Sequence, residues 1–134
     1  MRLVTRVASP GHGRRVSAED KSKFKGGALP YVPPVAAPIT LSYNVAGVKD
    51  LILDADTLGK IFSGTTTTWD DAGIKALNPT AALPSTKIVP VVRQDSSGTS
   101  ENFTKFLAAA IPSTFAIKPG RQPEWPAAGT TRSP

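Results

Sequence analysis

Several residue types that support common protein chemistries are scarce or missing in this 134-residue chain. There is no cysteine, which excludes a disulfide framework, a thiolate metal site and a cysteine nucleophile. The only histidine, His12, lies in the basic N-terminal stretch, far along the chain from the serines that could act as nucleophiles. We therefore expect no enzyme activity, no catalytic residues and no bound metal or cofactor.

Long apolar runs are also missing. No stretch approaches the length needed to span a bilayer, so we expect no transmembrane segment. Arginine interrupts the first residues before the apolar region of a secretion signal could form, so we expect the chain as written to lack a signal peptide.

The net charge of +6 sits at the two ends of the chain. Residues 1–27 hold seven Lys/Arg and two Asp/Glu (+5), residues 28–118 hold seven of each sign (0), and residues 119–134 hold two against one (+1). A neutral middle gives a folded domain no electrostatic reason to bind nucleic acid. We therefore divide the chain into a basic, disordered head (1–27), one folded domain (28–118) and a disordered Pro/Arg-containing tail (119–134).

Strand patterns and helix patterns alternate in the middle section, which predicts an α/β fold. Residues Ile39–Tyr43 alternate apolar and polar side chains, as a strand with one buried face does. Residues Lys87–Val92 are almost continuously apolar, which predicts a strand covered on both faces. Pro90 conflicts with that strand unless its missing donor faces an edge or a bulge.

Three helices are expected between and after these strands. Asp54 or Asp56 is placed to cap the first, which should end near Gly64. The pair Asp70-Asp71 is placed to cap the second, which should end before Pro79. The third should end at Pro112 and carry one apolar stripe, formed by Phe103, Phe106, Leu107, Ala110 and Ile111.

The turn between the second strand and the third helix is the most informative segment. Backbone N–H groups in the first turn of a helix lack partners and lie at the positive end of its dipole, so they can hold an anion. Gly98 lets backbone approach a ligand closely, and the hydroxyls of Ser97 and Thr99 can donate to an oxyanion. Arg93 can supply a two-pronged charged donor, and Asp95 could hold that guanidinium in place.

A simpler interpretation of the same residues stays open. Ser97, Thr99 or Ser100 could serve only as the helix N-cap, and Arg93 and Asp95 could form an ordinary surface pair. Phosphate-binding P-loop and dinucleotide fingerprints are absent. The spacing of the aspartates fits helix caps better than a calcium loop.

Seven motifs in order resemble the PstS-type phosphate-binding proteins of bacterial ABC transporters. The most specific is the turn Arg93-x-Asp95-x-Ser97-Gly98-Thr99, and the resemblance covers roughly Ala28 to Phe115. The other six are Ala37–Asn44, Gly47-Val48, Leu53–Gly64, Thr68–Asp71, Ala76–Pro79 and Leu83-Pro84.

The resemblance implies a class II periplasmic-binding-protein fold, with two α/β lobes that clamp inorganic phosphate and pass it to an ABC permease. It also implies a periplasmic or cell-surface location. Carried over by position, the phosphate-binding residues would be Arg93, Ser97, Gly98 and Thr99, with Asp95 orienting Arg93. Ser96 stands where the family often has glycine.

The departures from the family predict an incomplete receptor. Neither the early hydroxyl-bearing loop nor the Ser-Asp turn of the first lobe is present, which leaves the hinge strand and the first half of the second lobe. We therefore expect a truncated or inactive form with weakened phosphate binding. Two other functions remain as hypotheses: a phosphate-handling enzyme domain that uses the same turn, and a nucleic-acid-binding or interaction protein that acts through its basic ends.

Overall fold

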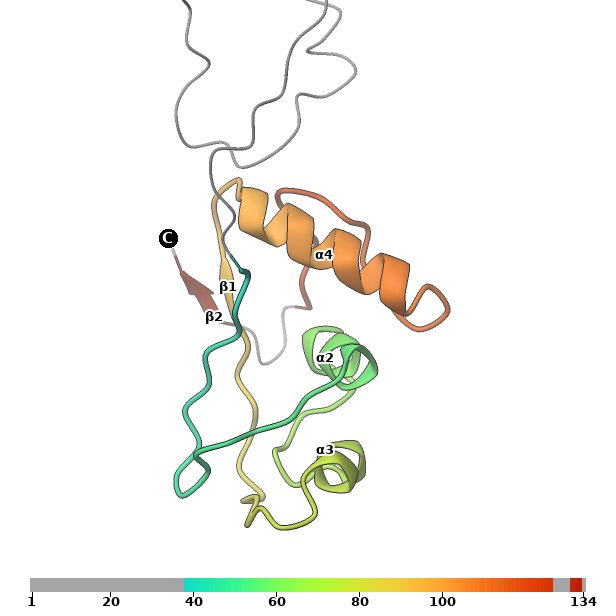
Figure 1. The fold of residues 1–134 in the computed structure, drawn as a ribbon. Helices are drawn as coiled ribbons and strands as arrows, with labels where there is room; N and C mark the ends of the chain where they lie inside the picture. Colours follow the sequence, from blue (N-terminus) through green and yellow to red (C-terminus); the bar gives the residue numbers. More distant parts are fainter. Residues whose placement is uncertain (1–37, 127–130, 134) are drawn as a thin grey trace, which may run out of the picture. The chain divides into compact units, whose positions relative to one another are not determined.

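The computed structural model describes residues 38–126 and 131–133. Chain contacts divide the protein into two units, Met1–Pro38 and Ile39–Pro134, and every described helix and strand lies in the second (Figure 1). The basic head, with its expected disorder, lies outside the described residues. No helix in the two described stretches is long and apolar enough to cross a membrane.

The first two expected helices form where the aspartates indicated. Helix α2 spans Ala55–Phe62, and the Asp54 carboxylate accepts a hydrogen bond from the Thr57 N–H at 2.8 Å. The chain leaves this helix through Gly64, whose φ of +74° suits glycine. Helix α3 spans Ala72–Leu77 and is capped by the Asp71 carboxylate.

Buried Asn78 ties the end of α3 to the segment that leads into α2. Its side-chain amide donates to the Ile52 carbonyl and accepts from the Ile52 N–H, both at 2.8 Å. This two-way pairing satisfies backbone groups that would otherwise lack partners, and it fixes the apolar run Leu51–Leu53 beside α3.

The main core cluster lies between α2, α3 and the chain that approaches β1. Its buried members are Ile61, Ile74 and Ile88. Partly buried apolar residues pack around them, namely Leu51, Leu53, Phe62, Trp69 and Leu83. Phe62 also reaches away from this cluster toward α4 and the C-terminal residues, where its ring lies 4.8 Å from Phe103 and 5.4 Å from Trp125, measured between ring centroids.

Helix α4 spans Gly98–Ala110, as expected, but the prediction of which face it buries was partly wrong. Its buried residues are Ser100, Thr104 and Leu107, whereas Phe106 is 55% exposed and Ala110 is exposed. The small polar face turns inward because residues 120 and 121 cover it, and the Thr104 hydroxyl accepts from the Gly120 N–H at 3.3 Å.

Both predicted strands differ from the structure. Strand β1 is only Val91–Arg93, and both its first residue, Val91, and the preceding Val89 are exposed rather than covered on both faces. Upstream, Lys87 makes only an isolated antiparallel bridge with Thr68. Pro90, which has no N–H to donate to a ladder, lies between this bridge and β1.

The strand expected at Ile39–Tyr43 is not formed. These residues have no strand partner among those the structure describes. The partner of β1 is instead β2 (Thr131–Ser133), which runs parallel to it with Val91 opposite Thr131.

Residues 119–126, which the sequence analysis placed in the tail, make specific contacts with the rest of the described chain. Trp125 is buried, and the Arg121 carbonyl accepts from the Ser97 N–H at 2.9 Å. These contacts place the C-terminal residues next to the candidate turn, a location that composition alone did not suggest.

Candidate functional site

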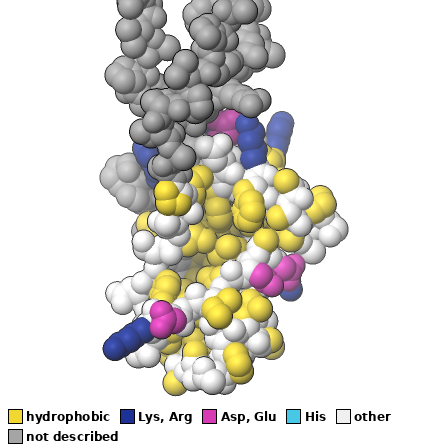
Figure 2. Space-filling view, in the orientation of Figure 1, with side chains coloured by type: hydrophobic (Ala, Val, Ile, Leu, Met, Phe, Trp, Pro, Cys, Tyr) yellow, Lys and Arg dark blue, Asp and Glu magenta, His cyan; other side chains and the backbone are white. Residues whose placement is uncertain are grey.

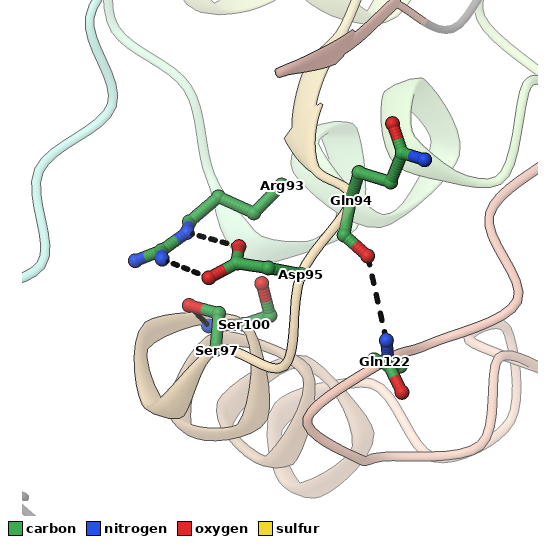
Figure 3. Close-up of polar contacts among 6 residues, drawn as sticks. All are labelled: Arg93, Gln94, Asp95, Ser97, Ser100 and Gln122. Carbon is green, nitrogen blue, oxygen red and sulfur yellow. Dashed lines mark hydrogen bonds and ion pairs between the residues drawn. The ribbon is translucent and has the colours of Figure 1, made fainter. Parts of the chain in front are cut away.

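The candidate turn joins the end of β1 to the start of α4, as the sequence predicted. Arg93 is the last residue of β1, and Gly98 is the first residue of α4. Figure 3 shows the side chains of Arg93, Asp95, Ser97 and Ser100 gathered at the N-terminal end of that helix. A strand that feeds directly into a helix N-terminus brings the strand's last side chain close to the helix's positive end.

Arg93 and Asp95 form a two-pronged ion pair (Figure 3). Arg93 Nε donates to Asp95 Oδ1 at 2.7 Å, and Nη2 donates to Oδ2. The pair lowers the pKa of Asp95 and raises that of Arg93, chiefly through these hydrogen bonds. A guanidinium has five N–H donors and Asp95 engages two, so further donors remain to contact a ligand. The side chains are 51% and 47% exposed, so solvent reaches both.

Ser97 is the N-cap of α4. Its hydroxyl accepts a hydrogen bond from the Ser100 N–H at 3.3 Å, and the residue is only 1% exposed. The simpler interpretation from the sequence therefore describes a contact that the structure contains. A hydroxyl that accepts one hydrogen bond still has a proton to donate, so capping alone does not remove Ser97 as an anion ligand.

The first two residues of α4 present backbone to an open surface. An added Cβ at Gly98 would meet nothing within 4 Å, and Thr99 is exposed. In the described part of the chain, the N–H groups of Gly98 and Thr99 have no hydrogen-bond partner. These are the N–H groups that a helix leaves unpaired at its N-terminus, and an oxyanion is a suitable acceptor for them.

Arg121 is a second cation at this site, and sequence reasoning missed it. Its positive charge adds to the lowering of the Asp95 pKa, after the larger effect of Arg93. Its Nε is buried without a hydrogen-bond partner among the described residues. Nearby, the Gln122 amide donates to the Gln94 carbonyl at 3.4 Å (Figure 3). Assigning residues 119–134 to a tail hid this arginine, although the buried Trp125 was a signal that this segment packs.

A small cavity of about 140 Å³ opens beside the turn. Its polar lining comes from Thr40, Arg93, Thr99 and Ser100, and its apolar lining includes Phe103 and Trp125. Two of the predicted phosphate-binding residues thus share one cavity. Ser97 and Gly98 immediately precede Thr99 in the chain but do not line the cavity. Ser100, considered earlier only as a possible cap, lines the cavity as well.

The other charged residues singled out in the sequence lie away from this cavity. Asp54 and Asp71 are helix caps, and Asp56 pairs with Lys60 at 2.6 Å. Within the described ranges, no three His, Asp or Glu side chains come together as metal ligands would.

Comparison with known proteins gives a consistent family match. A family model described as a PBP superfamily domain matches residues 12–132, a wider range than the resemblance used in the sequence analysis. Over 79 residues the chain is 49% identical to the phosphate-binding protein PstS2 of Mycobacterium bovis (strain BCG / Pasteur 1173P2). The matched segment covers 59% of this chain and 21% of that relative.

Two further relatives match over the same length of chain. The phosphate-binding protein PstS 2 of Mycobacterium tuberculosis (strain ATCC 25618 / H37Rv) is 49% identical over 79 residues, and PstS 3 of Mycobacterium leprae (strain TN) is 46% identical. Each match covers 59% of this chain and 21% of the relative, so the chain spans about a fifth of the length of these curated relatives.

Proposed function

Because the chain belongs to the PBP superfamily, we propose that it is a non-enzymatic phosphate-binding module derived from the substrate-binding component of a phosphate ABC import system. Inorganic phosphate would bind at the turn from Arg93 to Thr99. Within that superfamily, we assign the described residues to the hinge segment and the first half of the second lobe of a class II periplasmic-binding-protein fold. The intact receptor would act outside the cytoplasmic membrane and deliver phosphate to a permease.

The observation that best supports the proposal is the way Arg93 and the unpaired first turn of α4 flank one small cavity. Asp95 holds the guanidinium by two of its donors, which restricts the orientation of the rest. A phosphate oxygen near Thr99 could then accept from the helix N–H groups and from the arginine. Charged and dipolar donors that converge on one point favour a compact oxyanion.

The hydroxyl groups give the site a way to prefer phosphate over sulfate. A hydroxyl can donate to one phosphate oxygen or accept the proton of a hydrogen phosphate, whereas an arginine can only donate. Thr99 is exposed beside the cavity and is the best placed for this role, and the Asp95 carboxylate is a second acceptor. Sulfate carries no proton at neutral pH, so it cannot use either acceptor.

Arg121 extends the proposed site beyond the residues taken from the resemblance. Its charge already acts on Asp95, and its buried Nε has no hydrogen-bond partner in the described chain. Arg121 does not line the cavity, so the Arg121→Ala variant tests whether its charge acts on a phosphate bound there. We include Arg121 with Arg93, Ser97, Gly98 and Thr99 as a proposed phosphate ligand.

This site is half of a clamp. In the family resemblance, further phosphate contacts come from the first lobe, which this sequence does not match. Hydrogen bonds to a charged ligand contribute roughly 1.5 to 3 kcal/mol each, so losing several should weaken binding by orders of magnitude. The module should therefore bind phosphate far more weakly than an intact receptor.

Calorimetric titration of the full chain with phosphate and with sulfate tests the proposal. The key variants are Arg93→Ala and Arg121→Ala. Lys60→Ala is the matched control. Like Arg93, Lys60 is a partly exposed cation paired with an aspartate, but it lies on α2 and does not line the cavity. All three substitutions remove one positive charge.

Saturable binding that prefers phosphate, is lost in Arg93→Ala and persists in Lys60→Ala would support the proposed function. Binding that falls equally in all three variants would point to nonspecific attraction to net positive charge. No binding by the folded chain would mean that the turn does not hold phosphate without the other lobe.

A further inference from the structure

We propose that residues 119–126 form a strap that holds the turn from Arg93 to Thr99 in the shape that binds an oxyanion. Thr104, on α4, is the positioning residue that fixes this strap in place. This role rests on the proposed function, because the strap controls the affinity of the same site.

The strap is bonded to the turn at two points. The Ser97 N–H donates to the Arg121 carbonyl at 2.9 Å, and the Gln122 side-chain amide donates to the Gln94 carbonyl at 3.4 Å (Figure 3). Gln94 and Ser97 lie on either side of Asp95, whose carboxylate holds the arginine of the site. A strap that comes away therefore releases the backbone that carries this carboxylate.

Thr104 connects the strap to α4. Its hydroxyl accepts from the Gly120 N–H at 3.3 Å and donates to the Ser100 carbonyl at 2.8 Å. Thr104 has no exposed surface, so water cannot readily replace either bond. Thr104 does not line the cavity beside the turn, so its effect on a phosphate bound there is indirect.

The strap also decides which backbone donors stay available to a ligand. The Arg121 carbonyl takes the Ser97 N–H, and the Ser97 hydroxyl takes the Ser100 N–H. The N–H groups of Gly98 and Thr99 are left without a partner in the described part of the chain. With the peptides on both sides of them held, these two donors keep a fixed direction, which lowers the entropy that binding must remove.

Trp125 fixes the far end of the strap. Only 6% of its surface is exposed, and its ring centroid lies 5.4 Å from that of Phe62. Trp125 also lines the cavity that Arg93 and Thr99 line. The strap therefore forms part of the wall against which a ligand at the turn would lie.

The direction of a few donors matters here because the surrounding surface attracts anions only weakly. Residues 28–118 hold seven positive and seven negative side chains. On the face drawn in Figure 2, charged side chains of both signs are scattered among hydrophobic ones. Phosphate that binds the strapped turn more tightly than the unstrapped turn must stabilise the docked strap by the same factor.

The test uses the full 134-residue chain and a matched pair of substitutions at one position. Thr104→Val nearly keeps the shape of the side chain but removes its hydroxyl, whereas Thr104→Ser keeps the hydroxyl. Ile74→Val is the control for lost stability, because Ile74 is also fully buried but belongs to the core cluster beside α3. Calorimetric titration measures the phosphate Kd, and NMR measures hydrogen exchange at the Ser97, Gly120 and α2 amides with and without phosphate.

We expect Thr104→Val to weaken phosphate binding about tenfold, and to speed exchange at Ser97 and Gly120 about tenfold more than at the α2 amides. Thr104→Ser should change neither quantity by more than about twofold, and Ile74→Val should leave the Kd unchanged and affect both sets of amides alike. In the unsubstituted chain, saturating phosphate should slow exchange at Ser97 and Gly120 about tenfold more than at the α2 amides. This last measurement decides the question even if Thr104→Val does not fold.

Three results would overturn the proposal while leaving the proposed function intact. One is a Thr104→Val chain that binds phosphate as tightly as the unsubstituted chain. Another is a Thr104→Ser chain that loses as much affinity as Thr104→Val, since the hydroxyl would then not be the cause. The third is phosphate that binds but protects the strap amides no more than those of α2. If the unsubstituted chain binds no phosphate, the proposed function fails and the role of the strap in binding fails with it.

Discussion

The N-cap of α4 offers the sharpest test, because one hydroxyl has both a structural role and a proposed ligand role. Ser97→Ala removes the oxygen that accepts from the Ser100 N–H at 3.3 Å. Loss of a serine N-cap costs about 0.5–2 kcal/mol. The long hydrogen bond argues for the lower half of that range. The burial of Ser97 and Ser100 argues for the upper half, because water cannot readily replace the lost acceptor.

We therefore expect Ser97→Ala to lower the free energy of unfolding by about 1–1.5 kcal/mol. Urea denaturation at equilibrium, followed by tryptophan fluorescence and by circular dichroism, measures this change. Trp125 is buried and packs near Phe62, so its fluorescence should report the unfolding of the C-terminal packing.

The second role appears when the same denaturations are repeated with phosphate. At a ligand concentration of 100 times Kd, binding stabilises the native state by about 2.7 kcal/mol. If the Ser97 hydroxyl also donates to phosphate and its loss weakens affinity tenfold, the same concentration adds only about 1.4 kcal/mol. A variant that is destabilised but retains the full increment would show that Ser97 is a cap and nothing more.

A destabilisation under about 0.3 kcal/mol would refute the reasoning about the cap itself, since it would mean that the Ser100 N–H finds another acceptor at no cost. Ser97→Gly serves as the control, because glycine at an N-cap costs only a few tenths of a kcal/mol relative to serine. Both variants lose the hydroxyl, so the difference between them measures how much of the Ser97→Ala cost comes from the poor fit of alanine at an N-cap.

Three further predictions concern the packing that supports the site. Leu107→Ala, at a side chain with no exposed surface, should cost about 2–5 kcal/mol in urea denaturation. Hydrogen bonds from Thr57 lower the pKa of Asp54, so the charged Asp54 cap stabilises the fold above the ordinary aspartate pKa. That stabilisation is lost as the pH falls below about 4. Asp54→Asn caps the helix without titrating, so it should flatten this part of a curve of unfolding free energy against pH. A Cβ added at Gly59 would overlap Ile111 Cδ1, so Gly59→Ala should destabilise the fold by about 1–2 kcal/mol. Adding Ile111→Val removes that methyl group and should restore part of the lost stability. If thermal melts show that the effects of the two substitutions simply add, the contact is contradicted.

The helices were predictable from the sequence because their signals are local. Asp54 and Asp71 cap the first turns that follow them, and Gly64 lies just after the helix it was expected to end. A cap acts over three residues, so no knowledge of the rest of the fold is required. The turn from Arg93 to Thr99 was predictable for the same reason, since its strand, bend and helix start are adjacent in the chain.

The strands and the burial of α4 were not predictable in the same way, because they depend on partners far along the sequence. An alternating pattern indicates that residues 39–43 can form a strand, but it cannot supply the neighbouring strand. Phe106 lies on the apolar stripe by spacing, yet the face that α4 buries is the one covered by residues 120 and 121. Arg121 was missed for the same reason: its composition resembled a tail, and its contacts are non-local.

The hydrogen bond between the Ser97 N–H and the Arg121 carbonyl has a consequence for the order of folding. It closes a loop of 24 residues, counted as 121 minus 97, and the pairing of β1 with β2 closes one of 40, counted as 131 minus 91. Contacts of such separation form after local ones, because the entropy of closing the loop must be lost first. During synthesis, α2 and α3 can therefore be complete while the turn from Arg93 to Thr99 still lacks its contacts with residues 121 and 131.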